Sequence, residues 1–226
     1  MPAQQPTRRQ LLRAAAAGAI SATAAGLLAA CTTPDRECHT VTTPTTPARS
    51  DSTATLLVYF SRAGENYWNG DRRTLDVGNT EILANLIRDR IDCDVYRIEA
   101  AEAYSDRYDP TVARNVDEQN NDARPTIAQP LPDLSRYERV LLGSPIWNVQ
   151  PPMIMATFAE AADLTGKDVH PFVTYAVSGL GNTASFYREL NTRARFHDGL
   201  AVRGEEVRDT SAGSDVDRWL RAAGSA

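Results

Sequence analysis

The chain has 226 residues, of which 42% are hydrophobic and 23% charged, and its formal net charge is −5. This composition is typical of a globular protein, and the acidic balance argues against nucleic acid as a partner. Its three cysteines lack CxxC spacing and its three histidines are scattered, so the sequence gives no signal for a metal site.

Residues 1–30 resemble a bacterial export signal. Arg8 and Arg9 lie in a twin-arginine motif, and an uncharged stretch rich in Ala, Gly and Leu follows. That stretch is too weakly apolar for a spanning helix, which is typical of a signal peptide. It ends in LAAC, which looks like a lipobox with Cys31 as the lipidated residue. We therefore expect an exported protein, anchored by lipid on Cys31 to the outer face of the bacterial cytoplasmic membrane. An ordinary signal peptide that happens to contain a cysteine is the alternative.

Residues 31–53 are rich in Thr, Pro and Ser and should form a disordered tether. Residues 54–226 then form one domain with a sizeable core. Removal of the three leader arginines leaves 21 basic against 29 acidic residues, a net charge of −8. This permits docking to basic partners, although a solvated acidic surface is the more common explanation.

Strands and helices alternate along the predicted domain. Strands are expected at 56–60, 94–98, 140–143, 171–177 and 200–202, and helices at 79–91, 112–120, 153–162 and 183–194. A last helix begins at a capping box formed by Ser214 and Asp217. Repeated βα units with right-handed crossovers predict an α/β fold, a doubly wound parallel sheet with helices on both faces.

Ligands bind such sheets beyond the carboxyl ends of the strands. The loop at 61–80 carries Ser, Gly, Asn and Thr ahead of a helix N-terminus, where free N–H groups and the helix dipole favour a phosphate. An ordinary loop with a helix cap is the alternative.

Two further loops leave the same edge of the predicted sheet. In the loop after the third strand, Trp147 lies between Pro145 and Pro151, so we expect its indole to be held in the loop, clear of the core. An exposed, rigid aromatic side chain at a strand end suits stacking on a flat ligand. Simple coverage of the sheet edge is the alternative. The loop at 178–182 has two glycines, so its backbone amides can approach a ring closely.

The segments YFSRAGEN, VGNTE, LGSPIWNVQPP, SGLGNT and GLAVRG resemble the flavodoxin-like FMN proteins in content, order and spacing, from about Leu56 to Leu220. The resemblance implies a five-stranded sheet in the order 2-1-3-4-5 and FMN as the cofactor. It places around the phosphate Ser61, Arg62, Ala63, Asn66, Asn79 and Thr80. It places on one wall of the ring site Pro145, Ile146, Trp147 and Asn148, and on the other Ser178, Gly179, Leu180 and Gly181.

One segment departs from the family pattern. Residues 67–77 separate Asn66 from Gly78, whereas the usual loop runs unbroken into its helix. Which half of the interrupted loop holds the phosphate is left open by the sequence. The insertion is either a flap over the phosphate end or a surface excursion.

The resemblance implies a redox protein in which FMN carries the electrons, so no side chain need act as acid, base or nucleophile. An electron shuttle and an FMN-dependent quinone or nitro-compound reductase both fit, with a redox partner protein or a small oxidant such as a quinone as the acceptor. Twin-arginine systems export folded proteins, which suits a cofactor acquired in the cytoplasm. A flavin-free surface lipoprotein that keeps the fold as a binding module is the alternative.

Overall fold

The computed structural model describes residues 54–190 and 193–224. The predicted export signal (1–30), the tether (31–53) and the lipidation site Cys31 lie outside these residues and stay predictions. Within the described residues, no helix combines the length and the apolar character that crossing a membrane requires.

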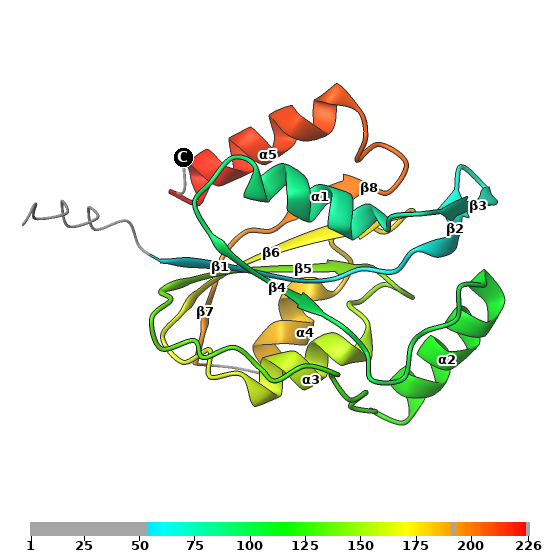
Figure 1. Cartoon of the computed structure of the whole chain (residues 1–226), viewed down its shortest axis with the longest axis horizontal. Coiled ribbons are helices and arrows are strands. Elements are labelled where there is room, and N and C mark those ends of the chain that lie inside the picture. Colours follow the sequence, from blue (N-terminus) through cyan, green and yellow to red (C-terminus); the bar gives the residue numbers. More distant parts are fainter. Residues whose placement is uncertain (1–53, 191–192, 225–226) are drawn as a thin grey trace, which may run out of the picture. The chain divides into compact units, whose positions relative to one another are not determined.

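A six-stranded, wholly parallel sheet forms the centre of the described domain (Figure 1). Its strands are β1 (Thr55–Phe60), β4 (Asp94–Ile98), β5 (Arg139–Pro145), β6 (Asp168–Tyr175), β7 (Arg195–Phe196) and β8 (Leu200–Arg203). The order is β4-β1-β5-β6, and both β7 and β8 pair with the outer edge of β6. The predicted order 2-1-3-4-5 is confirmed, with β8 as the fifth strand. The two-residue strand β7 was not predicted.

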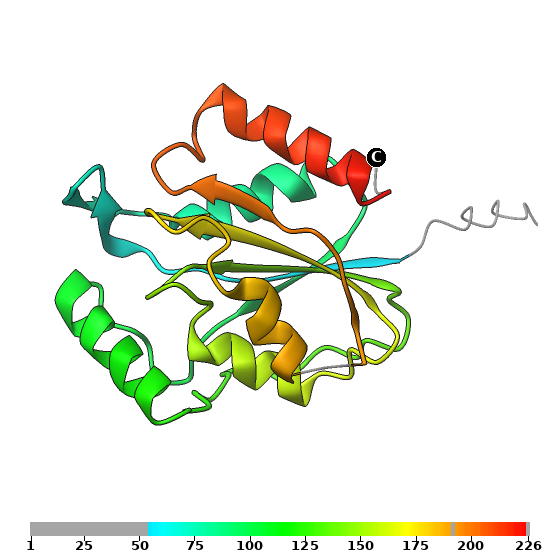
Figure 2. The same cartoon turned by 180° about the vertical axis from the view of Figure 1, so that it is seen from behind.

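Helices cover both faces of the sheet. On one face lie α1 (Asn79–Arg88) and α5 (Thr210–Ala222), and on the other α3 (Met153–Ala161) and α4 (Thr183–Leu190) (Figures 1 and 2). The fifth helix, α2 (Tyr108–Asn120), stands beside the carboxyl ends of the strands.

The sequence of β1 explains why it lies at the centre. Successive side chains of a strand point to opposite faces. Leu56, Val58 and Phe60 accordingly join the core beneath α3 and α4, whereas Leu57 and Tyr59 join the core beneath α1 and α5. All six residues of β1 are buried, as the apolar run predicts.

The last two helices differ from the prediction at one end each. Helix α5 begins at Thr210 with Asp209 as its N-cap, so the predicted capping box at Ser214 is wrong. Buried Ala212 extends the apolar stripe of this helix toward its N-terminus, and Asp217 instead forms an ion pair with Arg90 at 2.5 Å. Helix α4 ends at Leu190, shorter than the predicted 183–194.

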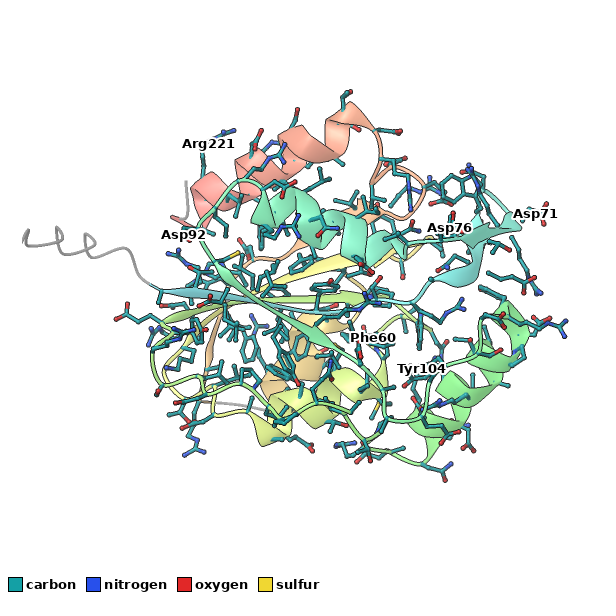
Figure 3. All side chains as sticks on the ribbon, in the orientation of Figure 1. Phe60, Asp71, Asp76, Asp92, Tyr104 and Arg221 are labelled. Atoms are coloured by element: carbon teal, nitrogen blue, oxygen red, sulfur yellow. The ribbon has the colours of Figure 1, made fainter. Side chains whose placement is uncertain are left out.

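The insertion folds as a β-hairpin of β2 (Gly64–Trp68) and β3 (Asp71–Leu75), whereas the sequence analysis left it as a loop. Asn69 and Gly70 form its turn with φ of 50° and 90°, the positive values of a type I′ turn. An Asn-Gly pair between strand-like segments is a strong hairpin signal, so this element was readable from the sequence. Asp71 lies at the hairpin tip (Figure 3).

Candidate functional site

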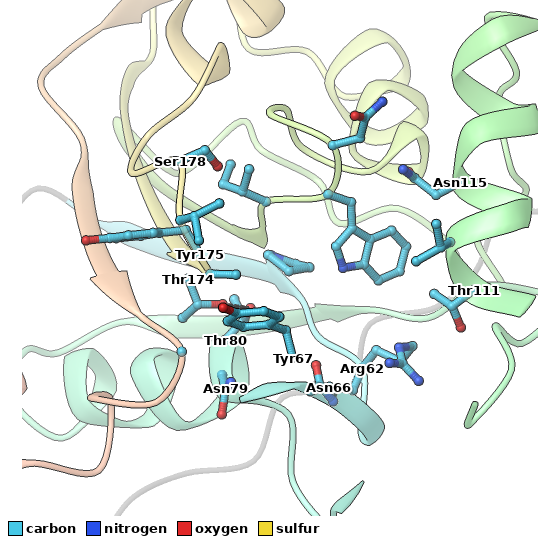
Figure 4. A pocket seen from close by; sticks show the side chains of 18 of the residues that line it. Arg62, Asn66, Tyr67, Asn79, Thr80, Thr111, Asn115, Thr174, Tyr175 and Ser178 are labelled. Carbon is cyan, nitrogen blue, oxygen red and sulfur yellow. Dashed lines mark hydrogen bonds between the residues drawn. The ribbon is translucent and has the colours of Figure 1, made fainter. Parts of the chain in front are cut away.

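A cavity of about 510 Å³ lies beyond the carboxyl ends of β1, β5 and β6. Its volume falls within the range of small-molecule and cofactor sites. The loops after these strands, the hairpin and α2 surround it (Figure 4). The position matches the one predicted from the topology of a doubly wound sheet.

Most of the predicted site residues line this cavity. The ten that do so are Ser61, Arg62, Asn66, Asn79, Thr80, Pro145, Ile146, Trp147, Asn148 and Ser178. Four others do not line it, namely Ala63, Gly179, Leu180 and Gly181. Gly181 instead packs behind the loop after β5, where an added Cβ would lie 2.2 Å from the Val149 carbonyl oxygen. The first part of the loop after β6, Ala176 to Ser178, therefore lines the cavity, whereas Gly181 supports the neighbouring loop.

The two halves of the interrupted loop meet at the N-terminus of α1. The hydroxyl of Ser61, at the end of β1, accepts a hydrogen bond from the N–H of Glu81 at 3.1 Å. Gly78 is the N-cap, and a Cβ there would lie 2.3 Å from Ser61 Oγ and 2.5 Å from the Arg62 carbonyl oxygen. Only glycine allows this approach, so the insertion leaves the helix N-terminus beside Ser61.

Side chains from distant elements fix the same helix end. The hydroxyl groups of Thr80 and Thr174 share a hydrogen bond of 2.7 Å. Arg208, in the loop before α5, donates to Asn79 Oδ1 at 2.7 Å and to the Val77 carbonyl at 3.0 Å. Burial and nearby Arg73 lower the pKa of Arg208 from its ordinary value. The sequence analysis missed Arg208 because no local pattern links it to a helix 129 residues away.

Arg62 holds the loop together rather than extending freely into the cavity. Its guanidinium donates to the carbonyl of Ser105 at 2.8 Å and to the carbonyl of Glu65. Burial lowers its pKa, partly opposed by the carboxylates of Asp106 and Glu65. Its Nε has no partner within the described residues.

Hydrogen bonds fix the hairpin as a wall of the cavity. The Glu65 carboxylate accepts a hydrogen bond from the N–H of Tyr108 at 2.9 Å. Arg72 forms a bidentate ion pair with Asp109, with N–O distances of 2.6 and 2.8 Å. On its other side, the N–H of Asn69 donates to Glu205 at 2.9 Å. Because the hairpin is tied to both α2 and the loop after β8, it presents Asn66 and Tyr67 to the cavity. Figure 4 shows Tyr67 among the side chains that line the cavity.

Trp147 lines the opposite end of the cavity. The indole meets the rings of Phe60 and Tyr104 edge-on, with centroid distances of 5.7 and 5.2 Å. Phe60 and Tyr104 lie next to each other in Figure 3. The side chain is therefore half-buried against the core, not held clear of it as predicted, and it faces the cavity as well. Gln119 on α2 donates to its carbonyl at 3.1 Å.

Residues 147–150 form a strained tight turn. Backbone hydrogen bonds join Trp147 and Gln150 in both directions, and Asn148 and Val149 have φ of 49° and 67°. Asparagine tolerates this left-handed region, but a β-branched residue there is an outlier. The N–H of Asn182 holds the Val149 carbonyl at 2.7 Å. A strained backbone thus lies directly beside the cavity.

We expect Val149→Gly to stabilise the fold. The left-handed conformation costs a β-branched residue about 1–2 kcal/mol, which exceeds the added chain entropy of glycine, about 0.5–1 kcal/mol. Since Val149 is 50% exposed, little buried area is lost. Urea unfolding should show a gain of about 0.5–1 kcal/mol. Val177→Gly, at an exposed position without positive φ, is the control and should destabilise. A lower unfolding midpoint for Val149→Gly would contradict the strain.

Helix α2 supplies a side of the cavity that the sequence analysis missed. Asn115 is only 3% exposed, and its Oδ1 has no hydrogen-bond partner within the described residues. The side chain points from α2 toward the cavity (Figure 4). Burying an unpaired polar atom costs about 1–3 kcal/mol. The unpaired Asn115 Oδ1 at the cavity wall therefore indicates that a bound ligand donates a hydrogen bond to it.

Comparison with known proteins assigns the family. The model of the flavodoxin family matches residues 75–221, and the chain belongs to this family. Among the curated proteins compared with it, none matches significantly.

Solved structures share the fold. A candidate flavoprotein from Bacteroides eggerthii is 25% identical, with a TM-score of 0.61 over 76% of this chain and 99% of that one. A candidate flavoprotein from Bacteroides uniformis is 24% identical, with a TM-score of 0.59 over 75% and 98%. A flavoprotein from Lactobacillus acidophilus, crystallised in complex with FMN, is 23% identical, with a TM-score of 0.54 over 74% and 99%.

Proposed function

We propose that this protein binds FMN in the cavity and transfers electrons through it. The observation that carries the proposal is the cavity itself, which joins the N-terminus of α1 to an aromatic wall at the carboxyl edge of a flavodoxin-family sheet. Bound FMN would supply the redox chemistry by taking up and releasing electrons. The protein's own residues would bind, orient and shield it.

The cavity residues fit the chemistry of FMN. The first N–H groups of α1 lack partners within the helix and favour a phosphate, and Ser61 adds a hydroxyl. Trp147 supplies an aromatic surface at the other end, and the unpaired Asn115 Oδ1 can accept from a hydroxyl or ring N–H of the cofactor. The phosphate therefore belongs at α1 and the flavin ring toward Trp147.

A spectroscopic titration of the purified protein tests this. Addition of FMN should shift and sharpen the flavin absorption bands at micromolar or lower concentration, and the bound flavin should be reduced by dithionite and reoxidised by an added acceptor. No binding at micromolar FMN would overturn the redox proposal and leave the flavin-free binding module.

We further propose that the acceptor is a redox partner protein or a small oxidant such as a quinone. The proposal for the location is anchoring by lipid on Cys31 to the outer face of the bacterial cytoplasmic membrane. The export signal and the LAAC sequence support it.

Replacement of the lipidated residue tests the location. A lipoprotein with two acyl chains on its modified cysteine binds a membrane stably, whereas a single chain is marginal. Cys31→Ser should therefore move the protein from the membrane fraction to the soluble fraction or the medium, measured by fractionation and immunoblot. Cys38→Ser, seven positions further along, is the control and should stay at the membrane. Retention of the Cys31→Ser protein would contradict the anchor.

A further inference from the structure

Exposed apolar side chains are concentrated in the lining of this cavity. Eight large apolar residues are exposed in the described chain, and four of them line this cavity. These four are Val112 (42% exposed), Val116 (39%), Val149 (50%) and Val177 (79%). Single exposed apolar residues are ordinary, but four around one opening form a patch, and patches mark binding surfaces.

The four valines come from three separate segments that line the cavity. Val112 and Val116 lie one turn apart on α2, Val149 lies in the strained turn, and Val177 follows β6. We call these four residues the valine mouth. The polar lining residues Asn79 and Thr80 lie at the α1 end of the cavity (Figure 4), and Ser61 is joined to the same end by its hydrogen bond from the Glu81 N–H. The cavity therefore has a polar α1 end where a phosphate fits, and the rest of its lining carries exposed valines interspersed with Asn115, Asn148 and Ser178.

Charge is scarce in this opening. Of the described residues that line the cavity, only Arg62 and Glu205 are charged. Arg62 donates to two backbone carbonyls, and Glu205 accepts the N–H of Asn69. On α2 beside the mouth, Arg114 is paired with Glu118 at 2.7 Å. The cavity thus has a single cationic side chain among its lining residues, Arg62, which is held by backbone carbonyls, so it offers little positive charge to an anionic co-substrate such as a second nucleotide.

We propose that the valine mouth admits a planar, uncharged acceptor of the quinone type, which takes electrons directly from bound flavin. The inference rests on the proposed FMN site and selects the small oxidant over the partner protein. An uncharged ring gains by leaving water for an apolar opening, whereas a charged acceptor loses its hydration there. A protein that docked through charge would need uncommitted charges around the opening.

The electron balance of the transfer is simple. Bound FMN, once reduced, would give two electrons and two protons to the acceptor, whose two carbonyl oxygens would become hydroxyl groups. The flavin returns to its oxidised form, so no other oxidant takes part. The reductant is the reduced flavin. In the test, dithionite reduces the bound flavin before the acceptor is added.

Stopped-flow oxidation of the dithionite-reduced, FMN-loaded protein tests the proposal. The acceptors are 1,4-naphthoquinone, the anion ferricyanide and the basic protein cytochrome c. The variant carries Val112→Ser together with Val116→Ser, and Val95→Ser is the matched control. Val95 is 44% exposed, similar to Val112, but it lies in the edge strand β4 and does not line the cavity.

The double variant should react with naphthoquinone about 10-fold more slowly, since the loss of small apolar contacts changes specificity by about this factor. Its reaction with ferricyanide and all reactions of Val95→Ser should stay unchanged. Equal naphthoquinone rates in all three proteins would overturn the proposal. Fast, valine-dependent oxidation by cytochrome c with slow oxidation by naphthoquinone would also overturn it and indicate a protein partner. FMN binding is measured first, so failure of the flavin site is recognised separately.

Discussion

Ser61→Ala should weaken FMN binding about 10- to 30-fold while leaving the affinity for riboflavin nearly unchanged. The Ser61 oxygen accepts the N–H of Glu81, and the structure assigns its proton no acceptor within the described residues. The hydroxyl can therefore donate to a phosphate placed at the N-terminus of α1. A hydrogen bond to a charged group contributes about 1.5–3 kcal/mol. The freed Glu81 N–H can turn to the phosphate and offset part of the loss, which sets our estimate at the lower end of the corresponding range.

Paired titrations with the two ligands make this test specific, because riboflavin lacks the phosphate. Trp147→Ala is the comparison variant and should weaken both ligands, since it removes the aromatic surface at the ring end. Equal losses of FMN and riboflavin on Ser61→Ala would place the phosphate away from α1. The unfolding midpoint of each variant must be compared with that of the parent, because Ser61 also caps the helix.

The central sheet was predictable because its signals are local. The continuous apolar run of β1 and the amphipathic stripe of α1 each follow from a few neighbouring residues. The position of the cavity then follows from topology, since parallel strands end at one edge. Ten of the predicted residues line it for that reason.

The missed parts of the site depend on long-range contacts. Helix α2 is mostly polar, so its sequence does not show that Asn115 is buried at the cavity wall. Arg208 reaches Asn79 across 129 positions. The edge-on contacts of Trp147 also require Tyr104, which lies in a long polar connection between β4 and α2. Each of these contacts depends on the assembled tertiary structure, which a pattern of neighbouring residues does not encode.

A buried histidine, His170, should make the stability of the fold depend on pH. His170, in β6, is 5% exposed and stacks on His197 with ring centroids 4.3 Å apart, and the edge of Trp219 lies near it. Asp168 lies 2.7 Å from the His197 ring and is paired with Arg195 at 2.8 Å. Burial, followed by the positive charges of His197 and Arg139, lowers the pKa of His170 to about 4 from its ordinary 6.5, although Asp168 opposes the shift.

The direction of the effect follows from proton binding. Between pH 6.5 and about 4 the unfolded chain binds a proton at His170 and the folded protein does not, so acidification favours unfolding. We expect this residue to remove about 2 kcal/mol of stability across that window, with a slope of at most about 1.4 kcal/mol per pH unit. His170→Gln keeps a polar side chain without the titration. Its free energy of unfolding should be lower at pH 7, because the stacking is lost, but should fall less steeply with acidification than that of the parent. Urea unfolding at half-unit pH steps measures both curves, and their difference isolates His170 from the carboxylates that also titrate. Parallel curves from pH 7 to pH 4 would show that His170 is protonated equally in the folded and unfolded states.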